Sequence, residues 1–141
     1  DIHVTKKSNE ITLTSRLEPT EWAVSIGPTR HAYFTVRIAD GLRVVDGGTL
    51  IDSEGAIGGN SVSNGNAAWV NASGIGPNSK RVGMTVIARA KDGTPHSYAH
   101  AWGRIALNPF LNKKRVVVVG DSLEFGVTYV AYDGDSPVLK S

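Results

Sequence analysis

The sequence predicts an all-β protein, a two-sheet antiparallel sandwich of the Ig-like or jelly-roll kind with about nine strands and no substantial helix. Apolar residues recur with the period of two that is typical of strands, whereas helical periodicity is almost absent. Sixteen glycines and six prolines interrupt the chain at short intervals, as turns between strands require. A hydrophobic fraction of 40% is typical of a globular chain, and 141 residues fit one domain.

The expected strands follow one another along the chain. The first contains Ile11, Leu13 and Leu17, and the others are residues 22–26, 33–38, 42–45, 49–51, 67–70, 82–91, 96–105, 115–119 and 123–132. The valine run of residues 116–119 predicts a strand that is buried on both faces. Residues 53–66 form the one long loop, for which a functional and a merely connecting role both stay open. We divide the chain into an N-terminal arm (1–9), one sandwich domain (10–132) and a C-terminal tail (133–141).

The central stretch, residues 82–105, predicts a hairpin with two different faces. The even-numbered residues of 82–90 and the odd-numbered residues of 97–105 are small or aliphatic. A four-residue turn after residue 91 would place the small residues of both strands on one apolar face. The opposite face would carry aromatic and cationic side chains, namely Arg89, Lys91, Tyr98, His100, Trp102 and Arg104.

Three interpretations of this second face stay open. Its rings and guanidinium groups are suited to stack on sugars, together with Trp69 and a loop that carries Asn64 and Asn66. The same residue types are typical of a subunit interface. In the third interpretation the face assignment is wrong, and Tyr98 and Trp102 pack between the two sheets. Burial of the neighbouring cations without partners would then be costly.

Composition excludes several classes of function. The chain has no cysteine, so disulfides and thiolate metal sites are not available. A net charge of +2 is too small to indicate a nucleic-acid partner, and no stretch approaches the roughly 20 apolar residues of a membrane span. His96 and His100 would lie about 13 Å apart on one strand, too far for one metal ion. We therefore expect no metal, no cofactor, no nucleic-acid partner and no membrane insertion.

Residues Gly120-Asp121-Ser122-Leu123, preceded by a run of valines, resemble the first sequence block of the GDSL (SGNH) esterases. The resemblance implies a nucleophile at Ser122, placed after a buried parallel strand. In that family a later Asp-x-x-His block follows, whereas no histidine follows Leu123 here. A serine without a base within hydrogen-bond reach is a poor nucleophile. We therefore expect no catalytic residue and no enzymatic activity, with an esterase acting through Ser122 as the remaining alternative.

A second resemblance lies in residues 11–19, Ile-Thr-Leu-Thr-Ser-Arg-Leu-Glu-Pro. They are similar to the N-terminal extension of bacterial chaperone–usher fimbrial subunits, in which a stretch like Ile-Thr-Val-Thr-Ala-x-Val-Asp-Pro inserts as a donor strand into the incomplete sandwich of the next subunit. The resemblance implies that Ile11, Leu13 and Leu17 are donor-strand residues, filling a groove beside an unpaired strand edge. Residues 133–137 depart from the usual terminal strand of those subunits.

We therefore expect a non-enzymatic module for surface assembly or adhesion, a structural or receptor-binding subunit of a bacterial fimbria or of a phage or virus particle. Its partners would be other copies of itself or related subunits. The first alternative is a lectin-type domain that binds a cell-surface glycan, and the second is a GDSL-type esterase fragment. The expected location is extracellular, on a cell surface or a virion. Removal of a signal peptide is one of two explanations for a start at Asp1, an expression boundary being the other.

Overall fold

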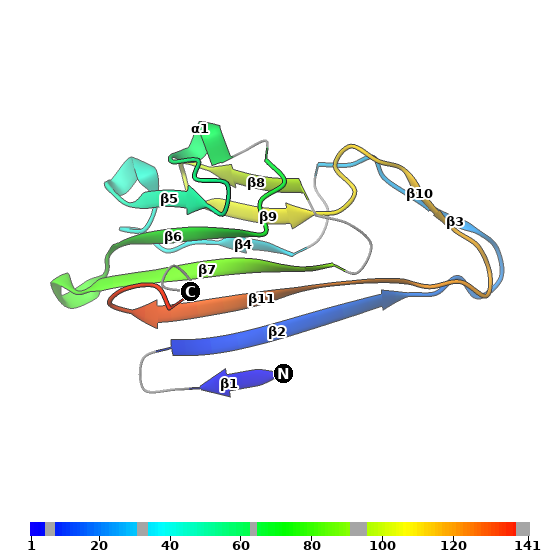
Figure 1. Cartoon of the computed structure of the whole chain (residues 1–141), viewed down its shortest axis with the longest axis horizontal. Helices are drawn as coiled ribbons and strands as arrows, with labels where there is room; N and C mark the ends of the chain where they lie inside the picture. Colours follow the sequence, from blue (N-terminus) through cyan, green and yellow to red (C-terminus); the bar gives the residue numbers. More distant parts are fainter. Residues whose placement is uncertain (5–7, 31–33, 63–64, 91–95, 138–141) are drawn as a thin grey trace.

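The computed structural model describes residues 1–4, 8–30, 34–62, 65–90 and 96–137. Its strands form two packed sheets and a separate ribbon (Figure 1). All the strand pairs in the described part are antiparallel. The helical segments of the described part are single turns of three or four residues. The predicted all-β sandwich is confirmed.

The elements are arranged as follows. The large sheet has six strands in the order β1 (Ile2–Val4), β2 (Ser8–Leu17), β11 (Leu123–Asp133), β7 (Arg81–Ala90), β6 (Trp69–Ile75) and β5 (Thr49–Asp52). The small sheet has three strands in the order β4 (Thr35–Arg37), β9 (Arg104–Asn108) and β8 (His96–His100). The ribbon pairs β10 (Arg115–Val117) with β3 (Val24–Ile26). The helical turns are η1 (Val44–Asp46), α1 (Gly59–Val62) and η2 (Pro77–Ser79).

The main core lies between the large and the small sheet, because one face of each carries aliphatic side chains. Val70 and Val86 pair on neighbouring strands of the large sheet, and Ile105 and Leu107 come from β9 of the small sheet. All four are fully buried or nearly so. Burying an aliphatic side chain of this size contributes roughly 1.5–3 kcal/mol, so this cluster holds the two sheets together.

A second cluster closes the end of the sandwich from which the ribbon leaves. The ring of Phe125 packs edge to face against Phe34 and Phe110, with centroids 5.7 and 5.5 Å apart. Val117 of the ribbon and Leu123 complete this cluster. Ile26 of β3 packs against the same cluster, so both strands of the ribbon are fastened to the body by apolar contacts.

β7 and β8 do not form the predicted hairpin. β7 lies between β11 and β6 in the large sheet, whereas β8 pairs with β9 in the small sheet. The expected turn and Lys91 fall in residues 91–95, outside the described residues. The alternation itself is kept, because Val86 and Ala99 are both fully buried in the main core, each from its own sheet. Inward-facing residues on two strands are compatible both with pairing side by side and with packing face to face.

The valines of residues 116–119 do not form a strand buried on both faces, so that prediction is wrong. Val117 is 6% exposed, whereas Val116 and Val119 are 59% and 52% exposed. They belong to the ribbon and the turn after it, which extend away from the two sheets (Figure 1). The ribbon pairs outside both sheets, and no second layer covers its outer face in the described part of the chain. Trp22, just before β3, is 75% exposed at the same end.

The outer face of the large sheet buries a group of polar side chains. Asn71 of β6 donates from Nδ2 to the hydroxyl oxygens of Thr85 (2.8 Å) and Tyr132 (2.6 Å). The hydroxyl of Ser136 lies 3.4 Å from that of Thr85. Residues 133–137, the described part of the expected C-terminal tail, therefore pack against the sheet and cover this group.

The half of the large sheet that carries β1 and β2 extends beyond the small sheet. Ile2 pairs with Ile11, and Leu13 pairs with the core residue Val127, so these side chains point to the core side. They remain exposed nevertheless, Ile11 at 40% and Leu13 at 46%. A groove of about 400 Å³ runs between this half and the edge strand β4, lined by Asn9, Ile11, Thr35, Val36, Met84, Tyr129 and Ala131.

β2 is also the segment for which the fimbrial resemblance implies a donor strand. In the structure Ile11, Leu13 and Leu17 lie in β2, which pairs with β11 along its length and with β1 over residues 9–11 of the same chain. The predicted N-terminal arm contains β1 and the first residues of β2. Residues 11–17 are thus part of this chain's own large sheet, paired with β11 throughout and with β1 at Ile11, and a role as donor strand would require the β11 ladder to open.

Candidate ligand-binding face

The outer face of the small sheet collects aromatic and cationic side chains from three strands. The strand register places two rows across the sheet, Arg37–Arg104–His100 and Thr35–Ala106–Tyr98. Residues directly opposite each other share a face, and the alternating residues Ile105 and Ala99 point into the core. Trp102 lies in the turn just beyond the first row. We call Arg37, Tyr98, His100, Trp102 and Arg104 the aromatic–cationic face.

The rings on this face contact one another and the guanidinium groups. The ring centroids of Tyr98 and His100 are 6.3 Å apart, and those of His100 and Trp102 are 4.9 Å apart. The Cζ atom of Arg37 lies 5.9 Å from the centroid of Trp102, and that of Arg104 lies 5.8 Å from the centroid of Tyr98. A cation within about 6 Å of a ring face is attracted to it. Each guanidinium is thus held beside a ring, while Trp102 stays 41% exposed.

Trp102 occupies a tight turn that the rest of the fold holds in place. Residues 101–103 form a turn directly after β8, whereas the sequence predicted one continuous strand over residues 96–105. The backbone N–H of Ile38 donates to the carbonyl of Gly103 (2.9 Å), and that of Val45 donates to the carbonyl of Ala101 (3.2 Å). Gly103 has a φ of +104°, which residues with a side chain rarely adopt. The position of the indole is therefore fixed by backbone contacts from β4's end and from η1.

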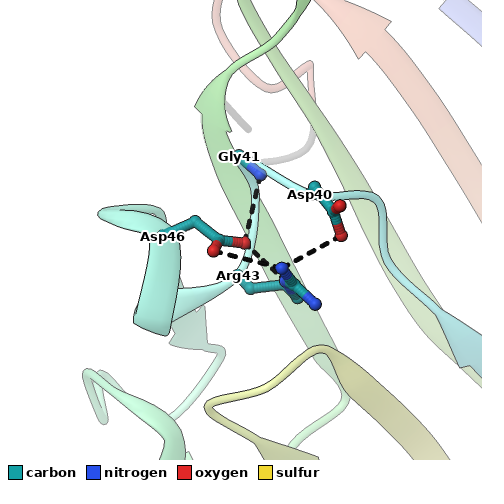
Figure 2. Close-up of polar contacts among 4 residues, drawn as sticks. All are labelled: Asp40, Gly41, Arg43 and Asp46. Atoms are coloured by element: carbon teal, nitrogen blue, oxygen red, sulfur yellow. Dashed lines mark hydrogen bonds and ion pairs between the residues drawn. The ribbon is translucent and has the colours of Figure 1, made fainter.

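Arg43 supports this turn and binds two carboxylates beside it (Figure 2). Its Cγ and Cδ pack against Gly103, where an added Cβ would lie 2.7 Å from them. Its guanidinium forms hydrogen bonds through Nε and Nη2 to Asp46 and an ion pair of 3.1 Å with Asp40. The hydrogen bond from Arg43 lowers the pKa of Asp46 below its ordinary value. Both carboxylates are therefore engaged by Arg43.

The two arginines of the aromatic–cationic face are not neutralised in this way. Within the described residues, neither Arg37 nor Arg104 forms an ion pair with a carboxylate. Nε of Arg104 and Nδ1 of His100 are buried and have no hydrogen-bond partner in that part of the chain. On the same face, burial lowers the pKa of His96, which favours its neutral form.

A pocket opens between these groups. It has a volume of about 260 Å³ and is lined by Thr35, Val36, Arg37, Trp102 and Arg104. One wall is thus an exposed indole and the others carry two guanidinium groups and a hydroxyl. Such a pocket offers an apolar flat surface together with hydrogen-bond donors in fixed positions.

The sequence predicted Arg89 on this face and Trp69 near it, whereas the structure places both on the large sheet. Arg89 lies on the outer face of the large sheet, where its Nε donates to the hydroxyl of Thr128 (3.0 Å). Trp69 pairs with Ile87 on that face as well. Asn66 is exposed next to Gly65, which forms a bridge with Ser97 of β8. Asn64 lies outside the described residues.

The loop of residues 53–66 packs against the turn that carries Trp102. Its helical turn α1 buries Val62 completely, and a Cβ on Gly59 would lie 2.6 Å from the backbone nitrogen of Ala101. Asp52 at its start accepts hydrogen bonds from the backbone N–H groups of Glu54 (2.9 Å) and Ala56 (3.0 Å). The described part of this loop is therefore anchored at both the sheet and the turn.

Two residues of the pocket, Thr35 and Arg37, were not among the predicted site residues. The alternation of Phe34, Val36 and Ile38 already indicates that Thr35 and Arg37 point away from the core. The sequence does not show that β4 pairs with β9, and only that pairing brings Arg37 to Trp102.

Ser122 lies exposed between β10 and β11, after an antiparallel ribbon strand. The GDSL resemblance implies a buried parallel strand at this place, so the local structure differs from that pattern. Within the described residues no group of three or more His, Asp and Glu side chains is arranged to hold a metal ion. The described part also contains no helix with the length and apolar character needed to cross a membrane.

The fold and this face together define an antiparallel β-sandwich protein with a surface pocket between an indole and two arginines. The chain belongs to the DUF6807 family, described as a family of unknown function, whose profile matches residues 1–139. Comparison with curated proteins and with solved structures gave no match.

Proposed function

We propose that the protein is a non-catalytic carbohydrate-binding domain and that the aromatic–cationic face is its binding site. The observation that carries this proposal is the exposed indole of Trp102, which forms one wall of the pocket beside Arg37 and Arg104. The carbon-bound hydrogens of a pyranose ring pack well against a flat aromatic surface, while its hydroxyl groups form hydrogen bonds with guanidinium and imidazole donors. Here the donors lie in one row of the sheet, and the indole lies in the turn just beyond that row.

Preorganisation supports the same function. The turn that carries Trp102 is held by backbone hydrogen bonds from Ile38 and Val45. Ligand binding therefore costs little conformational entropy in this turn. The arginines are held beside rings in the free protein. A site built on strands and an anchored turn keeps its geometry better than one on a free loop.

A binding experiment with matched tryptophan variants tests the proposal. The purified protein is screened against soluble polysaccharides by affinity electrophoresis, and the hits are measured by titration calorimetry. Trp102→Ala should weaken binding at least about ten-fold, which corresponds to about 1.4 kcal/mol. Trp22→Ala is the control, because Trp22 is also exposed but lies just before strand β3 of the ribbon. The proposal fails if no saccharide binds, or if the two variants lose affinity equally.

Self-assembly is a second candidate function, favoured by two uncovered apolar surfaces on separate parts of the molecule. One is the open half of the large sheet, where Ile2, Val4, Ile11 and Leu13 are exposed. The other is the ribbon end, with Trp22, Val24, Val116, Val118 and Val119. We propose for this case that the ribbon of one copy covers the open half-sheet of the next, which is a head-to-tail contact.

A mixing experiment tests this second candidate. A ribbon variant (Val116→Thr with Val118→Thr) and a half-sheet variant (Ile11→Thr with Leu13→Thr) should each be monomeric by light scattering, whereas the wild type associates. An equimolar mixture should form a dimer, in which the intact ribbon of the half-sheet variant covers the intact half-sheet of the ribbon variant. The dimer should not grow further, because its two remaining surfaces are the substituted ones. A wild type that stays monomeric at high concentration, or a mixture that does not associate, rules out this contact.

A further inference from the structure

Two arginines of the row Arg37–Arg104–His100 concentrate positive charge on the small sheet. Arg37 is directly opposite Arg104 on the neighbouring strand. Like charges at directly opposite positions of neighbouring strands repel each other and destabilise the pair. The fold therefore keeps an arrangement that is unfavourable in the free protein.

Nothing in the described part of the chain offsets this charge with a carboxylate. The acidic groups beside the adjoining turn, Asp40 and Asp46, are both bound by Arg43 (Figure 2). The cation–π contacts of Arg37 and Arg104 orient the guanidinium groups but leave their charge in place. A bound anion would remove the repulsion.

We propose, building on the carbohydrate site above, that its ligand is an acidic saccharide, one that bears a carboxylate or a sulfate on the ring. Arg37 and Arg104 line the same pocket as Trp102, so one sugar ring can stack on the indole while its acidic group reaches both guanidinium groups. Guanidinium groups bind carboxylate and sulfate oxygens through paired, charge-assisted hydrogen bonds. The two arginines select the charge of the ligand, and the indole holds its ring.

Pairs of ligands that differ only in charge separate this inference from the carbohydrate function itself. Polygalacturonate is compared with its fully methyl-esterified form, which keeps the ring and removes the charge. A sulfated galactan is compared in the same way with its desulfated form. The acidic member of at least one pair should bind at least about ten-fold more tightly, and this preference should shrink as salt rises. The two pairs also show whether carboxylate or sulfate is the preferred group.

Variants then assign the preference to the arginines. Arg37→Gln should reduce binding of the acidic form about ten-fold and binding of the neutral form by a much smaller factor, because the amide of glutamine still donates hydrogen bonds to hydroxyl groups. Arg104→Lys keeps the charge and loses the planar fork, so it should weaken the acidic ligand by a smaller factor. Arg81→Gln is the control, since Arg81 is exposed on the large sheet. Circular dichroism melting confirms that each variant is folded, and Arg37 is exposed enough for its replacement to be tolerated.

The outcomes are distinguishable. Equal binding of charged and neutral forms, or an Arg37→Gln variant that keeps the preference, overturns the acidic-ligand inference while the carbohydrate function stands. Absence of any saccharide binding overturns both. Aromatic and cationic surfaces also bind single-stranded nucleic acid, so a poly(dT) oligonucleotide is included, and tighter binding of poly(dT) than of any saccharide likewise overturns both.

Discussion

Arg37 and Trp102 meet on the outer face of the small sheet, with the Cζ atom of Arg37 5.9 Å from the centroid of the indole. Arg37 ends the edge strand β4, and Trp102 lies in the turn between β8 and β9 at one end of the same sheet. The contact therefore joins the edge strand to this turn, and both residues line the pocket. It depends on the backbone of the turn, which several residues with no part in binding hold in place.

Replacing Gly103 tests how strongly the turn determines the position of Trp102. Gly103 has a φ of +104°, and a Cβ would meet Arg43 at 2.7 Å. We expect Gly103→Ala to lower the free energy of unfolding by about 1–3 kcal/mol and to weaken ligand binding as well. Urea unfolding and titration calorimetry measure the two effects.

Gly120→Ala is the matched control for this variant. Gly120 has a similar φ of +94°, but a Cβ there would meet nothing within 4 Å. Gly120→Ala should therefore lower the free energy of unfolding through backbone strain, without the displacement of Arg43 that a Cβ at residue 103 would cause. Ligand binding should be unchanged. If both variants bind ligand like the wild type, the turn does not control the site.

The stability of the fold should depend on pH through His96. Burial lowers the pKa of His96 below its ordinary value of 6.5, so the unfolded chain takes up a proton at a higher pH than the folded protein does. The free energy of unfolding should then fall as the pH drops below 6.5 towards the folded-state pKa, and this contribution should be constant above 6.5. Urea unfolding over about pH 5 to pH 8, a range that brackets the ordinary histidine pKa, measures the slope.

His96→Gln removes the titrating group and should flatten this part of the pH profile. The Nε2 atom of His96 is buried and has no hydrogen-bond partner among the described residues, so an imidazolium there would gain no compensating bond. A variant that keeps the full slope below pH 6.5 would assign the effect to other groups.

Much of the fold could be predicted from alternation, because the burial of a strand residue depends mainly on which face it occupies. Ala99 is buried and Tyr98 and Trp102 point outward, as the pattern of residues 97–105 indicates. Alternation does not say which strand lies next to which. β7 and β8 both point small residues into the same core, but they do so from opposite sheets. The prediction that they pair side by side therefore assigned Arg89 to the wrong face of the molecule.

The ribbon was mispredicted for a different reason. Consecutive valines give no alternation, and their β-propensity is the same in a central strand and in a projecting pair. Val116 is exposed because β10 pairs with β3 alone in the described part and so lies outside the two packed sheets. A local sequence pattern does not show how strands are arranged in this way. Arg37 was missed in the same way, since its partner strand could not be read from the sequence.

Val62 should be a stability determinant although it lies in the long loop. It is fully buried in the main core, so Val62→Ala should reduce the free energy of unfolding by about 1–3 kcal/mol through lost burial and a residual cavity. Val45→Ala is the control, because Val45 is 62% exposed and its contact with Ala101 is made by the backbone. A negligible effect of Val62→Ala in urea unfolding would show that the loop is not anchored in the core.

The hydrogen bonds beneath the C-terminal segment should couple Asn71 and Tyr132. The Nδ2 group of Asn71 donates to the hydroxyl of Tyr132 at 2.6 Å, and both side chains are buried on the outer face of the large sheet. Tyr132→Phe removes the acceptor and leaves a buried donor with one partner fewer, which should cost about 1–2 kcal/mol. In a double-mutant cycle with Asn71→Ala, the two losses should sum to more than the loss in the double variant, because both remove the same bond. Tyr129→Phe, on the opposite face of the same strand β11, should change the free energy of unfolding little, and additive losses in the cycle would contradict the coupling.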